Sequence, residues 1–132
     1  MLKSTSNASY DIQYHFVWIP KYRKRVLQGA LKKRLEEMIH LCVQINEFEI
    51  MELGIQPDHV HLFLSAKPRH SPAKIMHLIK GGTAYQIRQE FPELEEVLWG
   101  DIFWADGYYV STHGKWTEAT VRRYIQHQHH NS

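Results

Sequence analysis

The chain has little of several features that mark special classes of protein. It has one cysteine, Cys42, so it forms no internal disulfide, which is typical of a protein in a reducing cytoplasm. No apolar run approaches the roughly 20 residues that cross a bilayer. The opening stretch, MLKSTSNASYD, lacks the apolar core of a secretory signal. We therefore expect a cytoplasmic protein with no membrane segment.

The net charge is also small. Lys and Arg total 16 and Asp and Glu total 14, a formal charge of +2, which by itself does not indicate a polyanionic partner. The basic residues are clustered, however, with Arg122 next to Arg123 and a denser group earlier in the chain. Such patches can bind phosphates on a nearly neutral protein, although each can also be a solvated turn. The early group consists of Lys21, Arg23, Lys24 and Arg25.

The length and composition predict one globular domain over residues 1–132, because 43% of the residues are hydrophobic. Alternating or β-branched runs predict strands at 12–19, 48–55, 59–65 and 107–112. Helical spacing predicts helices at 28–46, at 72–91 after the Ser71 cap, and from Thr117 to Gln128. Residues 93–106 read as irregular. Gly81 and Gly82 fall inside the second helix, so either a neighbour approaches closely there or the helix is broken.

This order of elements predicts an α+β fold of the ferredoxin-like (RRM-like) type. The pattern β-α-β-β-α-β gives one antiparallel sheet with two helices on one face. An additional C-terminal helix then carries Tyr124. The second face of the sheet stays open unless that helix or another element covers it.

Two histidines interrupt the third predicted strand, in the stretch QPDHVHLFLS. Because strand side chains alternate, His59 and His61 project onto the open face, whereas Val60 and Leu62 point to the helix-packed core. Neutral imidazoles bind divalent transition metals, but a hydrogen-bonded surface pair is the plainer interpretation. The surrounding residues do not match histidine-triad hydrolases, binuclear zinc hydrolases or a closed structural zinc site. An open metal site with a third ligand from elsewhere remains.

The last predicted helix, TEATVRRYIQHQ, places Tyr124 and Gln128 one turn apart on one face. Taken alone, they read as a core tyrosine and a residue at a fraying helix end. If this helix covers the open face of the sheet, both side chains meet the histidine pair.

A His-hydrophobic-His strand, followed later by a helical Tyr with Gln one turn beyond, resembles the single-tyrosine HUH transposases of small insertion sequences, the IS200 type and its relatives. The resemblance covers nearly the whole chain in the expected order. The supporting stretches are YHFVWIPKYR, MELGIQPDHVHLFLSA, IKGGTAYQIR, LWGDIFWADGYYVST and VRRYIQHQ.

The resemblance implies cleavage and rejoining of single-stranded DNA through a 5′-phosphotyrosine on Tyr124. It also implies Mg²⁺ or Mn²⁺ as the metal ion, with His59, His61 and Gln128 as ligands. The implied partner is a hairpin at the end of the element. We expect DNA contacts from Lys21, Arg23, Lys24, Arg25 and Lys80, with base stacking by Trp99, Trp104, Tyr108 and Tyr109 as an alternative to their packing in the core.

The resemblance further implies a homodimer in which each Tyr124 helix docks on the partner subunit, so that active sites are shared in trans. Sequence alone leaves cis or trans docking open.

Two other functions remain possible at this point. The same strand order builds RNA-recognition modules, but these need exposed aromatics on the central strands, where this chain has His59 and His61. A metal-dependent hydrolase with a purely structural Tyr124 is the second alternative. A covalent protein–DNA adduct would distinguish the transposase from both.

Overall fold

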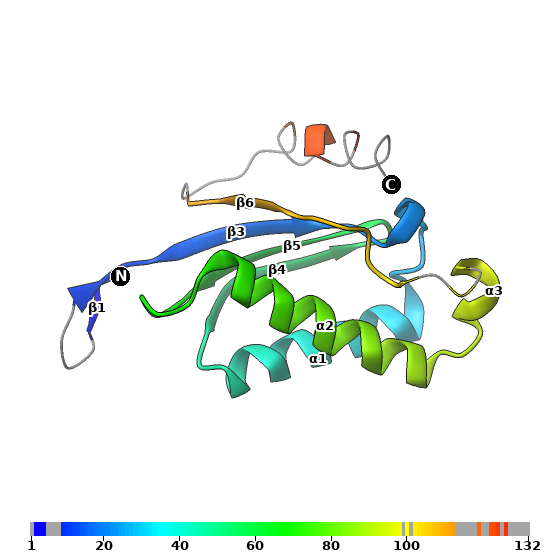
Figure 1. Ribbon diagram of the computed structural model, residues 1–132, viewed down its shortest axis with the longest axis horizontal. Helices are drawn as coiled ribbons and strands as arrows, with labels where there is room; N and C mark the ends of the chain where they lie inside the picture. Colours follow the sequence, from blue (N-terminus) through cyan, green and yellow to red (C-terminus); the bar gives the residue numbers. More distant parts are fainter. Residues whose placement is uncertain are drawn as a thin grey trace.

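The computed structural model describes residues 2–4, 9–98, 100, 102–112, 119, 122–124 and 126. Its main sheet consists of β3 (Gln13–Trp18), β4 (Glu49–Gln56), β5 (His59–Ser65) and β6 (Tyr109–Ser111). The strands are antiparallel neighbours in the order β4-β5-β3-β6. Helices α1 (Gly29–Ile45) and α2 (Pro72–Glu90) lie side by side on one face (Figure 1). This arrangement confirms the predicted ferredoxin-like fold class.

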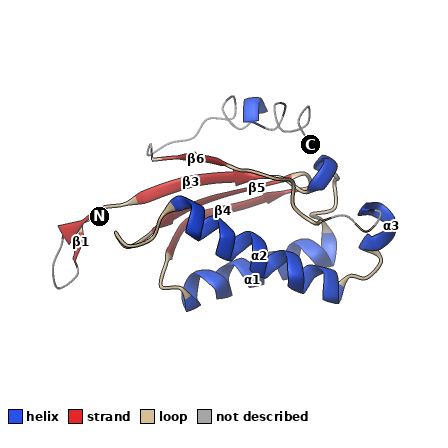
Figure 2. Ribbon diagram, viewed as in Figure 1, coloured by secondary structure: helices blue, strands red, loops and turns tan. Residues whose placement is uncertain are grey.

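The two central strands, β3 and β5, pair over six residues, with Phe16 opposite Leu62 and Trp18 opposite Val60. These positions point toward the helices, where all four side chains are at most 1% exposed. The core therefore lies between the sheet and the helix layer, as the two-layer view in Figure 2 shows. The buried helix residues include Leu31, Leu35, Met38, Ile39, Ile75, Met76, Ile79 and Ile87.

Helix α2 begins as its sequence predicts. The Ser71 hydroxyl accepts a hydrogen bond of 3.1 Å from the backbone N–H of Lys74, and Pro72 occupies the first turn, where no amide donor is needed. Further along, Thr83 accepts a hydrogen bond of 3.0 Å from the Trp104 indole. Trp104 is buried in the core, which removes it from the candidates for base stacking.

Three details differ from the sequence predictions. Helix α2 runs unbroken through Gly81 and Gly82. Among the residues that the structure describes, none would meet a Cβ placed at either glycine within 4 Å, so both alternatives proposed for this pair are wrong. A short helix, α3 (Leu94–Leu98), forms within the segment predicted to be irregular, and it buries both of its end residues. Strand β6 is shorter than predicted, since Gly107 has a left-handed φ of 82°.

A small hairpin precedes the sheet. It pairs β1 (Lys3–Ser4) with β2 (Ser9–Tyr10), and its polar sequence gave no strand signal. A single turn of 3-10 helix, η1 (Lys21–Arg23), follows β3. Among the residues that the structure describes, no helix combines the length and apolar composition needed to cross a membrane.

Replacing Gly81 and Gly82 by alanine should stabilise the protein. Each Cβ projects into open space, and alanine favours a helix interior by about 0.5–1 kcal/mol over glycine. We expect the free energy of unfolding in urea to rise by about 1–2 kcal/mol in the double variant. The matched control is Gly29→Ala, which also has open space but a φ of 58°, and should lower that free energy. A destabilised double variant would show that the glycines serve a close contact after all.

Candidate active site on the open face of the sheet

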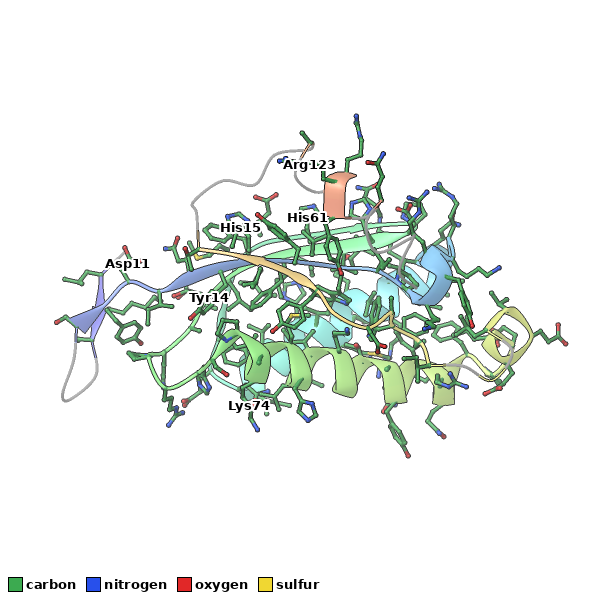
Figure 3. The ribbon with its side chains drawn as sticks, turned by 45° about the horizontal axis from the view of Figure 1, so that its top comes forward. Asp11, Tyr14, His15, His61, Lys74 and Arg123 are labelled. Carbon is green, nitrogen blue, oxygen red and sulfur yellow. The ribbon has the colours of Figure 1, made fainter. Side chains whose placement is uncertain are left out.

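The histidine pair lies where the strand alternation predicts, on the sheet face opposite α1 and α2. The pairing register places His61 between Val17 on β3 and Gly54 on β4. His59 is opposite Gln56, at the start of β5. Figure 3 shows His61 on the side of the sheet that faces the segment carrying Arg123. The two imidazoles thus lie on the sheet face toward which Arg123 also lies.

Gly54 makes room for the ring of His61. A Cβ at position 54 would lie 1.8 Å from His61 Nε2 and 2.4 Å from its Cε1, well inside any allowed contact. The imidazole therefore occupies the space that a side chain at position 54 would take. No local sequence pattern predicts this contact, because it depends on which residue of β4 lies opposite His61.

Burial keeps His61 neutral. Its side chain is 9% exposed, and desolvation lowers its pKa below the usual value near 6.5, with smaller lowering contributions from His59 and His15. Glu52 acts in the opposite direction without reversing the shift. At neutral pH the ring therefore retains a lone pair that can coordinate a metal ion.

The ring of His59 is held by the residue before it. Its Nδ1 lies 2.9 Å from Oδ1 of Asp58, and Oδ2 of the same carboxylate lies 3.4 Å from Nε of Arg23. Asp58 connects the histidine pair to the basic loop after β3. Asp58 was not among the predicted site residues, although its position directly before His59 is a usable signal.

A third histidine, His15 on β3, lies on the same sheet face and was also missed. Its ring stacks on Phe63 with centroids 4.0 Å apart and an interplanar angle of 12°, and the side chain is 3% exposed. Figure 3 shows His15 and His61 on the same side of the sheet. Side chains alternate along the predicted strand 12–19. Once this strand is paired with 59–65, the alternation places His15 on the same face as the other two histidines.

Tyr124 packs on this open face. It is 9% exposed and forms an apolar cluster with Val17, Ile19 and Ala105, and its ring centroid lies 6.2 Å from that of Tyr109. Because Val17 is the β3 partner of His61, Tyr124 lies over the strand next to the histidine pair. Gln128, predicted as the third metal ligand, lies outside the described residues.

The environment of the Tyr124 hydroxyl is apolar. Among the described residues, none forms a hydrogen bond with this buried oxygen. Desolvation raises the pKa of the phenol above its usual value near 10. The ring is therefore well positioned, but this surface does nothing to promote loss of its proton.

The predicted basic residues separate into two places. Lys21, Arg23, Lys24 and Arg25 belong to the loop that follows β3, and Arg23 brings this loop to Asp58. Lys80 lies on α2, where its ammonium donates hydrogen bonds of 2.8 and 2.9 Å to the backbone oxygens of Ala105 and Gly107. Burial lowers the pKa of Lys80. It thus anchors the segment before β6, and a DNA contact by Lys80 remains only a prediction.

His59 and His61 are the described residues best suited to hold a metal ion. Within the described ranges, no three His, Cys, Asp or Glu side chains surround one metal position. Two imidazoles fit a divalent ion, but a complete site needs at least one further donor.

Comparison with known proteins gives one consistent family. The model of the family described as "Transposase IS200 like" matches residues 8–128. The chain is 34% identical over 120 residues to the ISDra2 transposase TnpA of Deinococcus radiodurans, which covers 91% of this chain and 86% of that protein. It is 30% identical over 126 residues to the transposase for insertion sequence element IS200 of Salmonella typhimurium, and the match covers 96% of this chain and 82% of that protein.

Solved structures agree with this result. A crystal structure from Deinococcus radiodurans R1, assigned as a transposase, superposes with a TM-score of 0.89 at 32% identity, covering 96% of this chain and 98% of that one. A REP-associated tyrosine transposase bound to a REP hairpin superposes with a TM-score of 0.57 at 14% identity. The match covers 95% of this chain and 68% of that one, and it shows a shared fold.

Gly54→Ala should displace the His61 ring, because the added methyl group cannot coexist with Nε2 in its present position. We expect the ring NMR signals of His61 to shift and the free energy of unfolding to fall by about 1–3 kcal/mol from overpacking. Gly81→Ala is the matched control and should leave the His61 signals unchanged, since its Cβ meets nothing. Wild-type His61 signals in Gly54→Ala would contradict this contact.

Proposed function

Because the chain belongs to the IS200-like transposase family, whose members cleave and rejoin DNA, we propose that it acts on single-stranded DNA through a 5′-phosphotyrosine on Tyr124. The observation that carries this proposal is the packing of Tyr124 over Val17, the strand partner of His61. A tyrosine and a pair of imidazoles on one sheet face suit a phosphoryl-transfer site. A site that hydrolysed DNA with water would have no use for the tyrosine.

In the proposed reaction, the Tyr124 oxygen attacks the scissile phosphorus in line. The new bond joins this oxygen to phosphorus, and the bond from phosphorus to the 3′ oxygen breaks. The phenolic proton ends on the released 3′-hydroxyl. The phosphotyrosine preserves the energy of the ester, so another 3′-hydroxyl can displace Tyr124 and reseal the strand without ATP.

His59, His61 and Gln128 would hold the metal ion, Mg²⁺ or Mn²⁺. When bound, the ion would polarise the scissile phosphate and stabilise its developing negative charge. Neutral ligands suit this role because they leave the ion its full positive charge. Burial supports the assignment of His61, since its pKa is lowered and the ring stays neutral.

The proposed substrate is a hairpin at the end of the insertion element. The structural relative bound to a REP hairpin shares this fold, which supports the proposal for this chain. The basic loop of Lys21, Arg23, Lys24 and Arg25 would bind backbone phosphates, because Arg23 already connects that loop to the histidine pair through Asp58.

We also propose a homodimer with active sites shared in trans. In the single chain, the Tyr124 side chain packs on its own sheet, against Val17 and Ile19. Trans docking would place the same apolar side of Tyr124 on the equivalent surface of the partner, so it replaces this contact with an identical one.

Tyr124→Phe should abolish covalent cleavage and leave DNA binding within about twofold, because only the hydroxyl is lost. The free energy of unfolding should stay the same or rise, since the hydroxyl is buried without a hydrogen bond to any described residue. Denaturing gels of labelled single-stranded element ends with Mg²⁺ would detect the adduct. Retained nicking by the variant would assign the nucleophile to Tyr108, Tyr109 or water.

Mixing His61→Ala subunits with Tyr124→Phe subunits tests the shared site. Each variant alone should be inactive. With trans docking, one site of the mixed dimer carries both defects and the other is intact, so an exchanged equal mixture should recover about a quarter of wild-type cleavage. With cis docking every site has one defect. An inactive mixture, with exchange verified by mass spectrometry, would rule out trans docking.

A further inference from the structure

We propose that Asp58 is a positioning residue, held in place by Arg23, that fixes the ring of His59 with Nε2 directed to a ligand. This role of Asp58 deepens the proposed function. It rests on that function only for the identity of the ligand, a divalent metal ion. The orientation and tautomer of His59 can be measured in the metal-free protein.

The contacts of the Asp58 carboxylate carry this inference. Its Oδ1 lies 2.9 Å from His59 Nδ1, and the Asp58 and His59 side chains are each 17% exposed. A carboxylate accepts hydrogen bonds and donates none, so Nδ1 must carry the hydrogen. When such a ring is neutral, its lone pair is on Nε2, which is the atom left to bind a metal ion.

The second oxygen of Asp58 has a partner of its own. Oδ2 lies 3.4 Å from Nε of Arg23, so the carboxylate cannot rotate away from His59 without leaving Arg23. Together, Arg23 and His59 define the direction of both oxygens. Asp58 is therefore restrained by two partners. A single surface ion pair would do little to fix its orientation.

The backbone of the basic loop is shaped to present Arg23. Tyr22 and Arg23 have φ values of 60° and 50°, a left-handed conformation that is uncommon outside glycine and clusters at functional sites. The loop is closed by a hydrogen bond of 2.9 Å from Arg23 N–H to Pro20 O. A second bond, of 3.0 Å, joins Leu27 N–H to Pro57 O, beside Asp58. Arg23 thus approaches Asp58 from a fixed direction.

A purely structural role for Asp58 predicts something different. Pro57 and Asp58 form the two-residue connection between β4 and β5, and aspartate is common in turns. Asp58 does not have a positive φ, so the turn accepts asparagine or alanine without backbone strain. A turn residue would affect stability alone, whereas a positioning residue must also affect the ring of His59.

Asp58→Asn is the first test, because the side chain keeps its shape. The amide can donate to Nδ1, which permits the opposite tautomer of His59, with the hydrogen on Nε2. Ring ¹⁵N NMR of the metal-free protein, followed upward in pH until the ring signals no longer change, should show wild-type His59 with its hydrogen on Nδ1. The Asn variant should lose that preference. The His59 signals are assigned by their absence in His59→Gln.

Mn²⁺ titration calorimetry provides the second readout. Asp58→Asn and Asp58→Ala should each weaken Mn²⁺ binding by about 10- to 100-fold, the usual effect of removing the carboxylate behind a histidine ligand. Arg23→Ala should weaken it by less than tenfold, because it leaves the bond to His59 intact. The matched control is Glu90→Ala, which removes an ion pair of 2.8 Å with Arg34 on the helix side and should change neither readout.

Each outcome decides the proposal. His59 keeping the wild-type tautomer in both Asp58 variants would overturn it, as would an equal loss of Mn²⁺ affinity in Glu90→Ala. If wild type binds no Mn²⁺, the metal part of the proposed function fails, and the NMR result alone then decides whether Asp58 positions His59. A changed tautomer with normal thermal melting separates this role from a defect in folding.

Discussion

The pairing of β3 with β5 is the constraint on which the rest of the structure depends. Its register directs Phe16 and Leu62 toward the helices, and it directs Val17 and His61 toward the opposite face. A shift of one residue would exchange the two sets, placing imidazoles in the core and large apolar side chains on the surface. The fold and the candidate site therefore depend on the same set of backbone hydrogen bonds.

Placing histidines within a closely packed sheet requires specific neighbours, and each ring has one. His61 fits because Gly54 has no side chain, and His59 is held by the carboxylate of Asp58. His15 stacks on Phe63 at 4.0 Å. The space for His61 comes from an adjacent strand, and the hydrogen-bond partner of His59 comes from the preceding residue in the chain.

Tyr124 occupies an apolar part of this face. This surface fixes the position of the ring but does not favour loss of the phenolic proton. Val17, Ile19 and Ala105 hold the ring, while burial raises the pKa of the phenol. In the proposed reaction, the positive charge that favours loss of the proton would therefore come from the metal ion and not from the surface beneath the ring. The same apolar surface is present on a second copy of the chain, which makes cis and trans docking chemically equivalent contacts.

The sequence by itself determined the main helices and strands and the two faces of β5. Period-two alternation predicted residues 59–65 as a strand with His59 and His61 on the open side, and the Ser71 cap predicted the start of α2, because these signals are local. Only the tertiary structure decided that Gly54 lies beneath His61, that Arg23 reaches Asp58, and that no residue in the described ranges packs on Gly81 or Gly82. Those contacts join residues whose proximity is set by strand register and loop conformation, which no local pattern in the chain encodes.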